Sequence, residues 1–205
     1  AAAASLATTA RAQDAKAGEK KAARCTGCHG IPGYQASFPE IHKVPMISGQ
    51  GAKYIASALN AYKKGERKHP TMRAIAATMS EQDIADISAY YEQHGKGAAT
   101  APEQAAPAPA DVAALLTKGA CASCHGANFS KPIDGSYPKI AGQHADFLYV
   151  ALKSYKTEGN PQVGRGNAIM SGQVKPFSPA ELKAIAKCLA SLPGELQTVP
   201  QSKFR

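Results

Sequence analysis

The pentapeptide Cys25-Thr26-Gly27-Cys28-His29 recurs later in the chain as Cys121-Ala122-Ser123-Cys124-His125. Two cysteines separated by two residues and followed directly by a histidine are the attachment signature of a c-type haem. The two thiols can add to the vinyl groups on one edge of the porphyrin, and the adjacent imidazole can then reach the iron. Two copies therefore predict two covalently bound haem c groups, attached through Cys25, Cys28, Cys121 and Cys124 and ligated by His29 and His125.

Two other chemistries use the same spacing of thiols. A single Cys-x-x-Cys pair is typical of thioredoxin-like redox proteins, but those proteins alternate strands and helices, a pattern that this chain lacks. Four thiolates from two such pairs can also bind one zinc ion. Here Cys25 and Cys121 stand 96 positions apart, far more than zinc fingers use, and a histidine follows each pair although zinc does not require one. Haem attachment is the interpretation that accounts for all of these features.

Composition favours a globular protein with few aromatic core residues. The chain has 205 residues, of which 44% are hydrophobic, 6% are aromatic and none is tryptophan. This length suffices for one large or two small domains. The formal net charge of +9, which haem propionates would reduce, favours acidic protein partners or an anionic membrane face. The chain has no dense Lys/Arg run and no nucleic-acid-binding motif, so we expect no nucleic-acid partner.

The first residues predict export. Residues 1–12 are rich in alanine and lack acidic side chains, and Ala10-Arg11-Ala12 resembles a small-x-small cleavage site. We interpret this segment as the end of an export signal, with a tail unrelated to export as the alternative. No apolar run approaches the roughly 18 residues that a membrane-spanning helix needs. We therefore expect a periplasmic protein, soluble or loosely held at the membrane face, because haem is attached to such motifs in that compartment.

The chain is a tandem repeat with a linker in the middle. Residues 95–110 are small and rich in proline and lack periodic apolar residues, which is typical of a linker. The linker separates a first domain at residues 13–94 from a second at residues 111–193. Residues 194–205 form a C-terminal extension to which the sequence assigns no role.

Each half begins with the same two predicted helices. A first helix leads into the haem motif, and Asp14 and Asp111 are the expected N-caps. A second helix follows, in which apolar residues recur at helical spacing over residues 54–62 and again over residues 147–155. These apolar stripes are expected to pack against the core or the haem.

The last helix of each half has the strongest start signal. Ser80 and Ser178 each stand three positions before an acidic residue, as in a capping box, and Pro179 occupies the first position of the second of these helices. No segment shows a strong strand pattern. The expected fold is therefore all-α in both halves.

The repeat also selects the second axial ligand. Methionine is the usual partner of histidine in electron-transferring cytochromes, and it raises the reduction potential. Met170 is the only methionine of the second half, and Met72 corresponds to it because each stands eight residues before the capping serine. We predict Met72 and Met170 as the sixth ligands, with core packing as the alternative role. The other two methionines, Met79 and Met46, align with Phe177 and Lys139.

The remaining histidines and the fifth cysteine have no partners at matching positions in the repeat. We expect these histidines to be surface or packing residues. If one of them replaces Met72 as a ligand, His69 is the first candidate, because His69 lies three residues before Met72. Cys188 is spaced to lie on the apolar face of its helix, so we expect a small buried residue rather than a ligand. The histidines in question are His42, His69, His94 and His144.

Together these features resemble the dihaem cytochrome c4 family. The resemblance covers about residues 14–192 and rests on the haem motifs and on the segments 72–76, 80–91 and 137–144. It implies two class I cytochrome c domains packed with approximate twofold symmetry, with the haem propionate edges near the interface and with His/Met ligation. Two segments depart from the family pattern, the loop at residues 31–44 and the longer loop at residues 159–168.

The resemblance implies a periplasmic electron carrier rather than an enzyme. Electrons would come from a quinol–cytochrome c oxidoreductase or a dehydrogenase and would pass to a respiratory terminal oxidase. Two alternatives stay open. The chain could be the cytochrome subunit of a dehydrogenase, or a dihaem redox enzyme in which a labile axial ligand exposes one iron.

Overall fold

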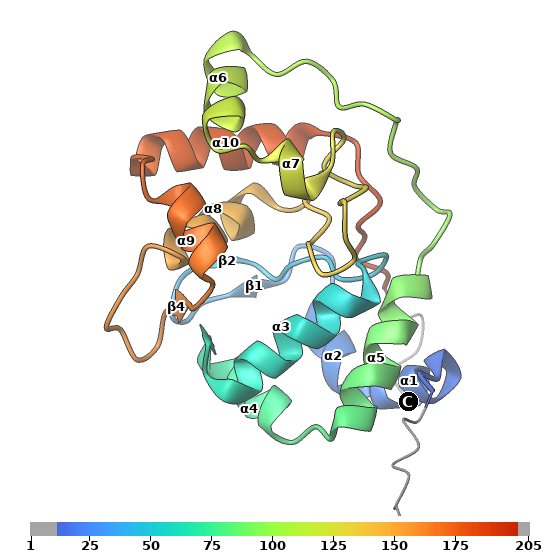
Figure 1. Ribbon diagram of the computed structural model, residues 1–205. Coiled ribbons are helices and arrows are strands. Elements are labelled where there is room, and N and C mark those ends of the chain that lie inside the picture. The colour runs from blue at the N-terminus through green and yellow to red at the C-terminus, as the bar shows by residue number, and fades with distance from the viewer. Residues whose placement is uncertain (1–11, 201–205) are drawn as a thin grey trace, which may run out of the picture.

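The structure is a computed structural model that describes residues 12–200, so the predicted export signal lies outside the described residues except for Ala12. Within this range the chain forms ten helices and four two-residue strands (Figure 1). No helix of the described range is long and apolar enough to cross a membrane. In chain order the elements are α1 (Ala15–Lys21), α2 (Ala23–His29), β1 (Gln35–Ala36), β2 (His42–Lys43), α3 (Ala52–Lys64), β3 (Arg67–Lys68), α4 (Pro70–Ala77), α5 (Glu81–Gln93), α6 (Ala110–Lys118), α7 (Ala122–His125), α8 (Ala145–Ser154), β4 (Gly164–Arg165), α9 (Ala168–Val174) and α10 (Pro179–Ser191).

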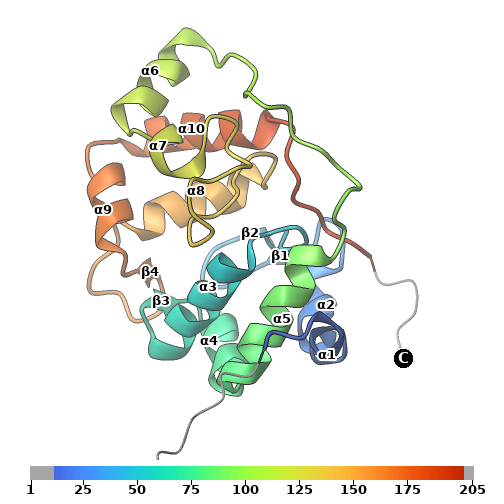
Figure 2. The same ribbon diagram turned by 45° about the vertical axis from the view of Figure 1, so that its right-hand side comes forward.

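The helices form two packed halves, and the all-α prediction is confirmed. Helices α1 to α5 make the first half and α6 to α10 the second, which lies above the first in Figure 1. Each half has its own apolar core, centred on Ile55, Leu59 and Ile84 in the first and on Leu148 and Leu182 in the second. The segment 94–109 contains neither helix nor strand and runs along one side of the molecule, at the right in Figures 1 and 2.

The predicted N-cap of the first helix is confirmed in one half and wrong in the other. The Asp14 carboxylate accepts hydrogen bonds from the amides of Lys16 at 2.9 Å and Ala17 at 3.1 Å. In the second half α6 begins two residues earlier than expected, with Pro109 as the N-cap. Asp111 therefore lies in the first turn, where its charge still interacts favourably with the helix dipole.

The segment before each haem motif forms two short helices instead of one. In the first half the break between α1 and α2 falls at Ala22, which is buried in the core. In the second half α6 ends at Lys118, and Ala120 adopts a left-handed φ of 45°, which a right-handed helix cannot accommodate. The break allows the haem motif to turn away from the axis of the helix that precedes it.

The predicted capping boxes are present in both halves. The Asp83 amide donates to Ser80 Oγ at 3.1 Å, and the Ser80 amide donates to the Asp83 carboxylate at 3.0 Å. Ser178 and Glu181 make the same reciprocal pair at the start of α10. These local bonds fix where α5 and α10 begin, and both helices contribute buried apolar residues to their cores.

Helices α1 and α5 cross at close range and are joined by a buried carboxylate. A Cβ atom at Gly18 would lie 2.1 Å from the backbone carbonyl oxygen of Asp86, so a side chain does not fit there. The Asp86 side chain, only 3% exposed, accepts hydrogen bonds from the Asp14 amide at 2.9 Å and from Lys21 Nζ at 2.7 Å. It therefore ties the start of the chain to the last helix of the first half.

We expect Asp86→Asn to lower the free energy of unfolding by about 2 kcal/mol at pH 7, because Lys21 loses a partner in a largely buried ion pair. Burial alone would raise the pKa of the Asp86 carboxyl, but the hydrogen bonds from Lys21 and the Asp14 amide outweigh burial and lower it. A carboxylate with a lowered pKa stabilises the fold above its ordinary pKa of about 4, and this stabilisation is lost as the pH falls through the folded value.

The difference between wild type and Asp86→Asn should therefore hold from pH 7 to about pH 5 and shrink below about pH 4. Urea unfolding at several pH values measures it. Glu158→Gln, which removes the charge of an exposed carboxylate, is the matched control. Its free energy of unfolding should stay within about 0.5 kcal/mol of the wild-type value. A difference that does not change with pH would contradict the assigned role of Asp86.

Candidate haem sites

A backbone carbonyl holds each motif histidine in place. His29 Nδ1 lies 2.8 Å from the carbonyl oxygen of Pro45, and His125 Nδ1 lies 2.9 Å from that of Pro138. Because a carbonyl oxygen only accepts, each Nδ1 carries the proton and donates, and Nε2 keeps its lone pair. Such a second hydrogen bond orients metal-ligating histidines in proteins. Both imidazoles thus have the tautomer and the fixed ring that iron ligation needs.

Burial favours the ligating form of both imidazoles. It lowers the pKa of His29 and of His125, while the bond to the proline carbonyl acts in the opposite direction and does not reverse the shift. A lowered pKa keeps the ring neutral, and only the neutral ring has a lone pair to give to a metal.

The motif thiols are free, partly buried and close to their histidines in sequence and in space. Cys25 and Cys28 lie on α2, while Cys121 and Cys124 lie at and within α7. Burial raises the pKa of Cys25 to about 11 and also raises that of Cys121. A reactive dithiol relies on a lowered thiol pKa, so the raised pKa values disfavour that role.

The arrangement of the motifs does not suit a single zinc ion. Helix α2 lies in the lower half of Figure 1 and α7 in the upper half, so the two pairs of thiols do not converge. Across residues 12–200 no group of three or more His, Cys, Asp and Glu side chains is placed to hold a metal ion. The donors instead fit two separate haems, each with two thiols and one oriented imidazole.

Each predicted methionine lies at the edge of the core that contains its haem motif. Met72 packs against the same apolar cluster as Cys25, and Met170 packs against the same cluster as Cys121. Both are only partly buried, unlike Met79, which is 2% exposed in the middle of the first core. The structure therefore brings each half's motif and its predicted methionine together around one core.

Met72 and Met170 also lie on helices with matching starts. Met72 is in the first turn of α4, where its amide donates to Nδ1 of His69 at 3.4 Å. Met170 is in the first turn of α9, where its amide donates to Oδ1 of Asn167 at 2.9 Å. His69 is therefore the N-cap of the helix that carries Met72, and this role was missed in the sequence. Its alignment with Asn167, an ordinary capping residue, was the available signal.

Among the other non-motif histidines, His42 and His94 pack against aromatic rings. His42 is 5% exposed, its Nδ1 donates to the Glu40 carbonyl oxygen at 2.9 Å, and its ring contacts those of His69 and Phe147. His94 stacks on Tyr90. His144 is the N-cap residue of α8.

Two further sequence expectations concern core residues. Met79 and Phe177 occupy equivalent buried positions, and the carbonyl oxygen of each accepts a hydrogen bond from a lysine, Lys63 in one half and Lys156 in the other. Both are packing residues, as their alignment predicts. Cys188 is only half-buried on α10, more exposed than expected.

The two halves exchange equivalent hydrogen bonds across their interface. The Gln50 side chain donates to the carbonyl oxygen of Lys139 at 3.0 Å and accepts from its amide at 2.9 Å. The Gln143 side chain donates to the carbonyl oxygen of Met46 at 2.9 Å and accepts from its amide at 3.0 Å. Both glutamines are buried and occupy matching positions in the repeat. We call these four bonds the glutamine clasp.

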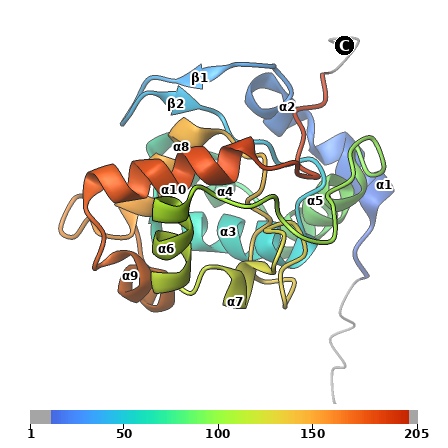
Figure 3. The same cartoon turned by 90° about the horizontal axis from the view of Figure 1, so that it is seen from above.

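Two more connections cross the interface. The β1–β2 hairpin of the first half lies beside α8 of the second (Figure 3), and the Lys43 amide donates to the Asp146 carboxylate at 2.9 Å. Beyond α10 the chain returns to the first half, where the Gln197 amide donates to the Ser48 carbonyl oxygen at 3.1 Å. Leu196 is buried in this contact. The described part of the C-terminal extension therefore fastens the second half to the first.

Comparison with known proteins places these features in context. Residues 15–95 and 109–193 both match the family model "Cytochrome c". The cytochrome c4 of Stutzerimonas stutzeri is 30% identical over 198 residues, covering 88% of this chain and 90% of that protein. The crystal structure of reduced recombinant cytochrome c4 from Pseudomonas stutzeri matches with a TM-score of 0.65 and 28% identity, covering 88% of this chain and 100% of that one. A thiosulfate dehydrogenase electron acceptor of Stutzerimonas stutzeri strain A1501 is 28% identical over 186 residues, covering 85% of this chain and 81% of that protein.

Proposed function

This chain belongs to the cytochrome c4 family of dihaem cytochromes c, and from that premise we propose which residues hold its haems and which partners it serves. It is an electron carrier with two covalently bound haem c groups, not an enzyme. The proposed thioether positions are Cys25, Cys28, Cys121 and Cys124, and the proposed axial ligands are His29 with Met72 and His125 with Met170.

The observation that carries this assignment is the identical construction of the two halves. In each half a proline carbonyl fixes the motif histidine, and a methionine in the first turn of a capped helix lies at the same core. When bound, each haem supplies a reversible one-electron couple. The bond to each histidine and the packing of each methionine against its core would hold the two donors in place, so that little rearrangement would accompany electron transfer.

We further propose that the protein works in the periplasm and delivers electrons to a respiratory terminal oxidase. The formal charge of +9 supports encounter with an acidic docking surface or an anionic membrane face. A quinol–cytochrome c oxidoreductase or a dehydrogenase would be the donor. The relative named as a thiosulfate dehydrogenase electron acceptor supports the dehydrogenase as a second candidate for this position.

The pathway can be tested with the reduced holoprotein and membranes that contain a cytochrome c-oxidising terminal oxidase. We expect oxidation that slows steeply as salt rises, because screening weakens attraction between opposite charges. Slow oxidation independent of salt would contradict the oxidase proposal. Rapid reduction by a thiosulfate dehydrogenase with thiosulfate, in the absence of oxidation by the membranes, would favour the dehydrogenase role. Carbon monoxide binding to either reduced haem would instead indicate an open axial position and thus catalysis.

A further inference from the structure

A buried tyrosine hydroxyl in the first half has no hydrogen-bond partner. Tyr91 lies near the end of α5, is 2% exposed and belongs to the apolar core of the first half. Within residues 12–200 its Oη atom is buried and makes no hydrogen bond. A buried hydroxyl without a partner destabilises a fold, so native proteins rarely retain one without a purpose.

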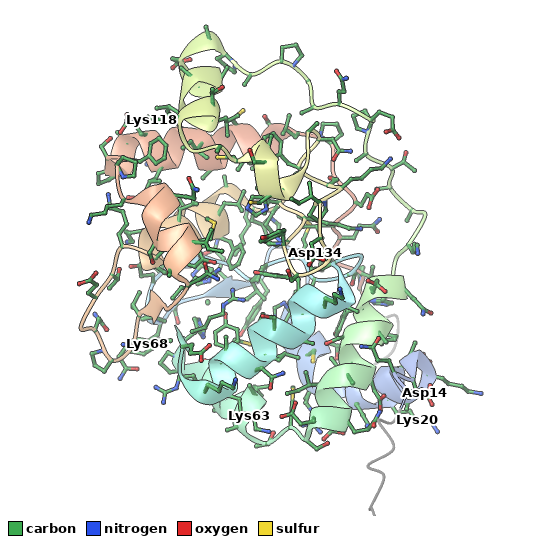
Figure 4. All side chains as sticks on the ribbon, in the orientation of Figure 1. Asp14, Lys20, Lys63, Lys68, Lys118 and Asp134 are labelled. Carbon is green, nitrogen blue, oxygen red and sulfur yellow. The ribbon has the colours of Figure 1, made fainter. Side chains whose placement is uncertain are left out.

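The ring that carries this hydroxyl is held by its neighbours. Its centre lies 5.1 Å from that of Tyr90 and 5.8 Å from that of His94, edge to face in both pairs. Helix α1 packs across α5, at the lower right of Figure 4 where Asp14 and Lys20 are labelled. These contacts keep the hydroxyl inside the core, away from the water that would otherwise bond to it.

The sulfur of Cys25 is the polar atom beside this hydroxyl. Cys25 packs against the same core as Tyr91 and is one of the proposed thioether positions. Burial raises the pKa of the Cys25 thiol, and the neighbouring Tyr91 hydroxyl acts in the opposite direction. A thiol donates and accepts weakly, whereas a thioether sulfur has no proton and only accepts. Attachment of a haem would therefore give the Tyr91 hydroxyl an acceptor.

The second half has no such hydroxyl. Tyr91 and Leu189 occupy equivalent positions, because each stands eleven residues after its capping serine. The carbonyl oxygen of each also accepts a hydrogen bond from a glycine amide, that of Gly49 at 2.8 Å and that of Gly142 at 2.9 Å. Leu189 is 3% exposed in the second core and offers Cys121 no polar group. Two sites that are otherwise built alike thus differ by one hydroxyl.

We propose that the Tyr91 hydroxyl donates a hydrogen bond to the thioether sulfur formed at Cys25 and thereby raises the reduction potential of the first haem alone. The inference rests on the haem sites proposed above. A donating hydroxyl turns the positive end of its dipole toward the sulfur and the macrocycle attached to it. That end favours the reduced form, which carries one electron more, and a dry core screens the effect little. The hydroxyl is therefore a positioning residue's group that makes the two haems unequal.

The test is a spectroelectrochemical titration of the dihaem protein and of Tyr91→Phe, which removes the hydroxyl and keeps the ring. We expect one of the two redox couples to shift toward the oxidised form by about threefold, which corresponds to about 28 mV for one electron, while the other stays in place. Tyr90→Phe is the matched control, because it removes a hydroxyl from the adjacent, partly buried ring. It should shift either couple by less than about 1.5-fold.

A second background identifies the couple that moves. Met170→Ala removes the proposed methionine ligand of the second haem, so in that background Tyr91→Phe should shift the couple that Met170→Ala leaves unchanged. The proposal is overturned if Tyr91→Phe shifts the potentials no more than Tyr90→Phe does, if both couples move equally, or if the couple altered by Met170→Ala is the one that moves. Haem content and the methionine-sulfur band are measured on the same samples, so failure of a haem site is distinguished from loss of the hydrogen bond.

Urea unfolding of the dihaem protein provides a second readout. Loss of a formed hydrogen bond should lower the unfolding midpoint of Tyr91→Phe, whereas removal of a hydroxyl that stays unpaired in the loaded protein should leave the midpoint unchanged or raise it, which would overturn the proposal. Tyr91→Leu covers the case in which the phenylalanine variant does not assemble. It copies Leu189 of the second half and should shift the same couple in the same direction.

Discussion

Replacing Met170 by alanine is expected to remove about half of the weak far-red band that methionine sulfur gives with oxidised haem iron. The same change should lower the reduction potential of one haem by at least about 100 mV, because a thioether ligand raises the potential of a histidine-ligated haem. Met72→Ala should remove the other half, and the double variant should have no band. The oxidised absorption spectrum and a redox titration measure both effects.

The control for this experiment is a methionine that the structure places in the core. Met79 is 2% exposed, so Met79→Ala should cost about 2–5 kcal/mol of stability yet leave the far-red band intact. His69→Asn tests the competing ligand, because Asn167 already caps the equivalent helix, and it should keep the full band. If Met170→Ala retains the complete band, the sixth ligand of the second haem is some other residue and the proposed site is wrong.

The features that the sequence could predict are those created by neighbouring residues. The capping boxes at Ser80 and Ser178 depend on side chains three positions apart, so the starts of α5 and α10 were predictable. The haem motifs are equally local, since five consecutive residues contain both thiols and the imidazole. The same local reasoning was wrong at Asp111, because Pro109 two residues earlier sets the helix start instead.

The features that the sequence could not predict depend on long-range contacts. Gln50 bonds to a residue 89 positions away and Gln143 to one 97 positions away, and no local pattern signals either bond. Their equivalence in the repeat was visible, but not that each would bind the other half's backbone. The pairing of Arg67 in β3 with Arg165 in β4 is also a long-range contact, and it joins two equivalent positions of the repeat directly. In the clasp, each glutamine bonds to the other half's backbone, so the same short segment contributes to the interface twice.

The glutamine clasp leads to the second prediction. We expect Gln143→Ala to lower the free energy of unfolding by about 2–3 kcal/mol, because it leaves the amide and the carbonyl of Met46 without partners at a buried interface. Gln50→Ala should have a similar effect through Lys139. Each variant should also weaken the coupling of the halves, so that they unfold in separate steps. Denaturant unfolding followed by haem absorbance and by circular dichroism measures the stability and the number of steps.

The double variant, with both Gln50 and Gln143 replaced by alanine, shows whether the two glutamines stabilise one shared interface or act independently of each other. Once either glutamine is removed the halves can part more easily, so the second removal should cost less than the first, and the two effects should not add. Gln173→Ala is the matched control, because Gln173 is an exposed residue of α9, and it should change stability by less than about 0.5 kcal/mol. Effects that add fully, with one unfolding step retained, would mean that the clasp stabilises each half by itself. The rigid placement of the two haem sites would then have to come from other connections between the halves, among them the β1–β2 hairpin, the β3–β4 strand pair and the C-terminal extension.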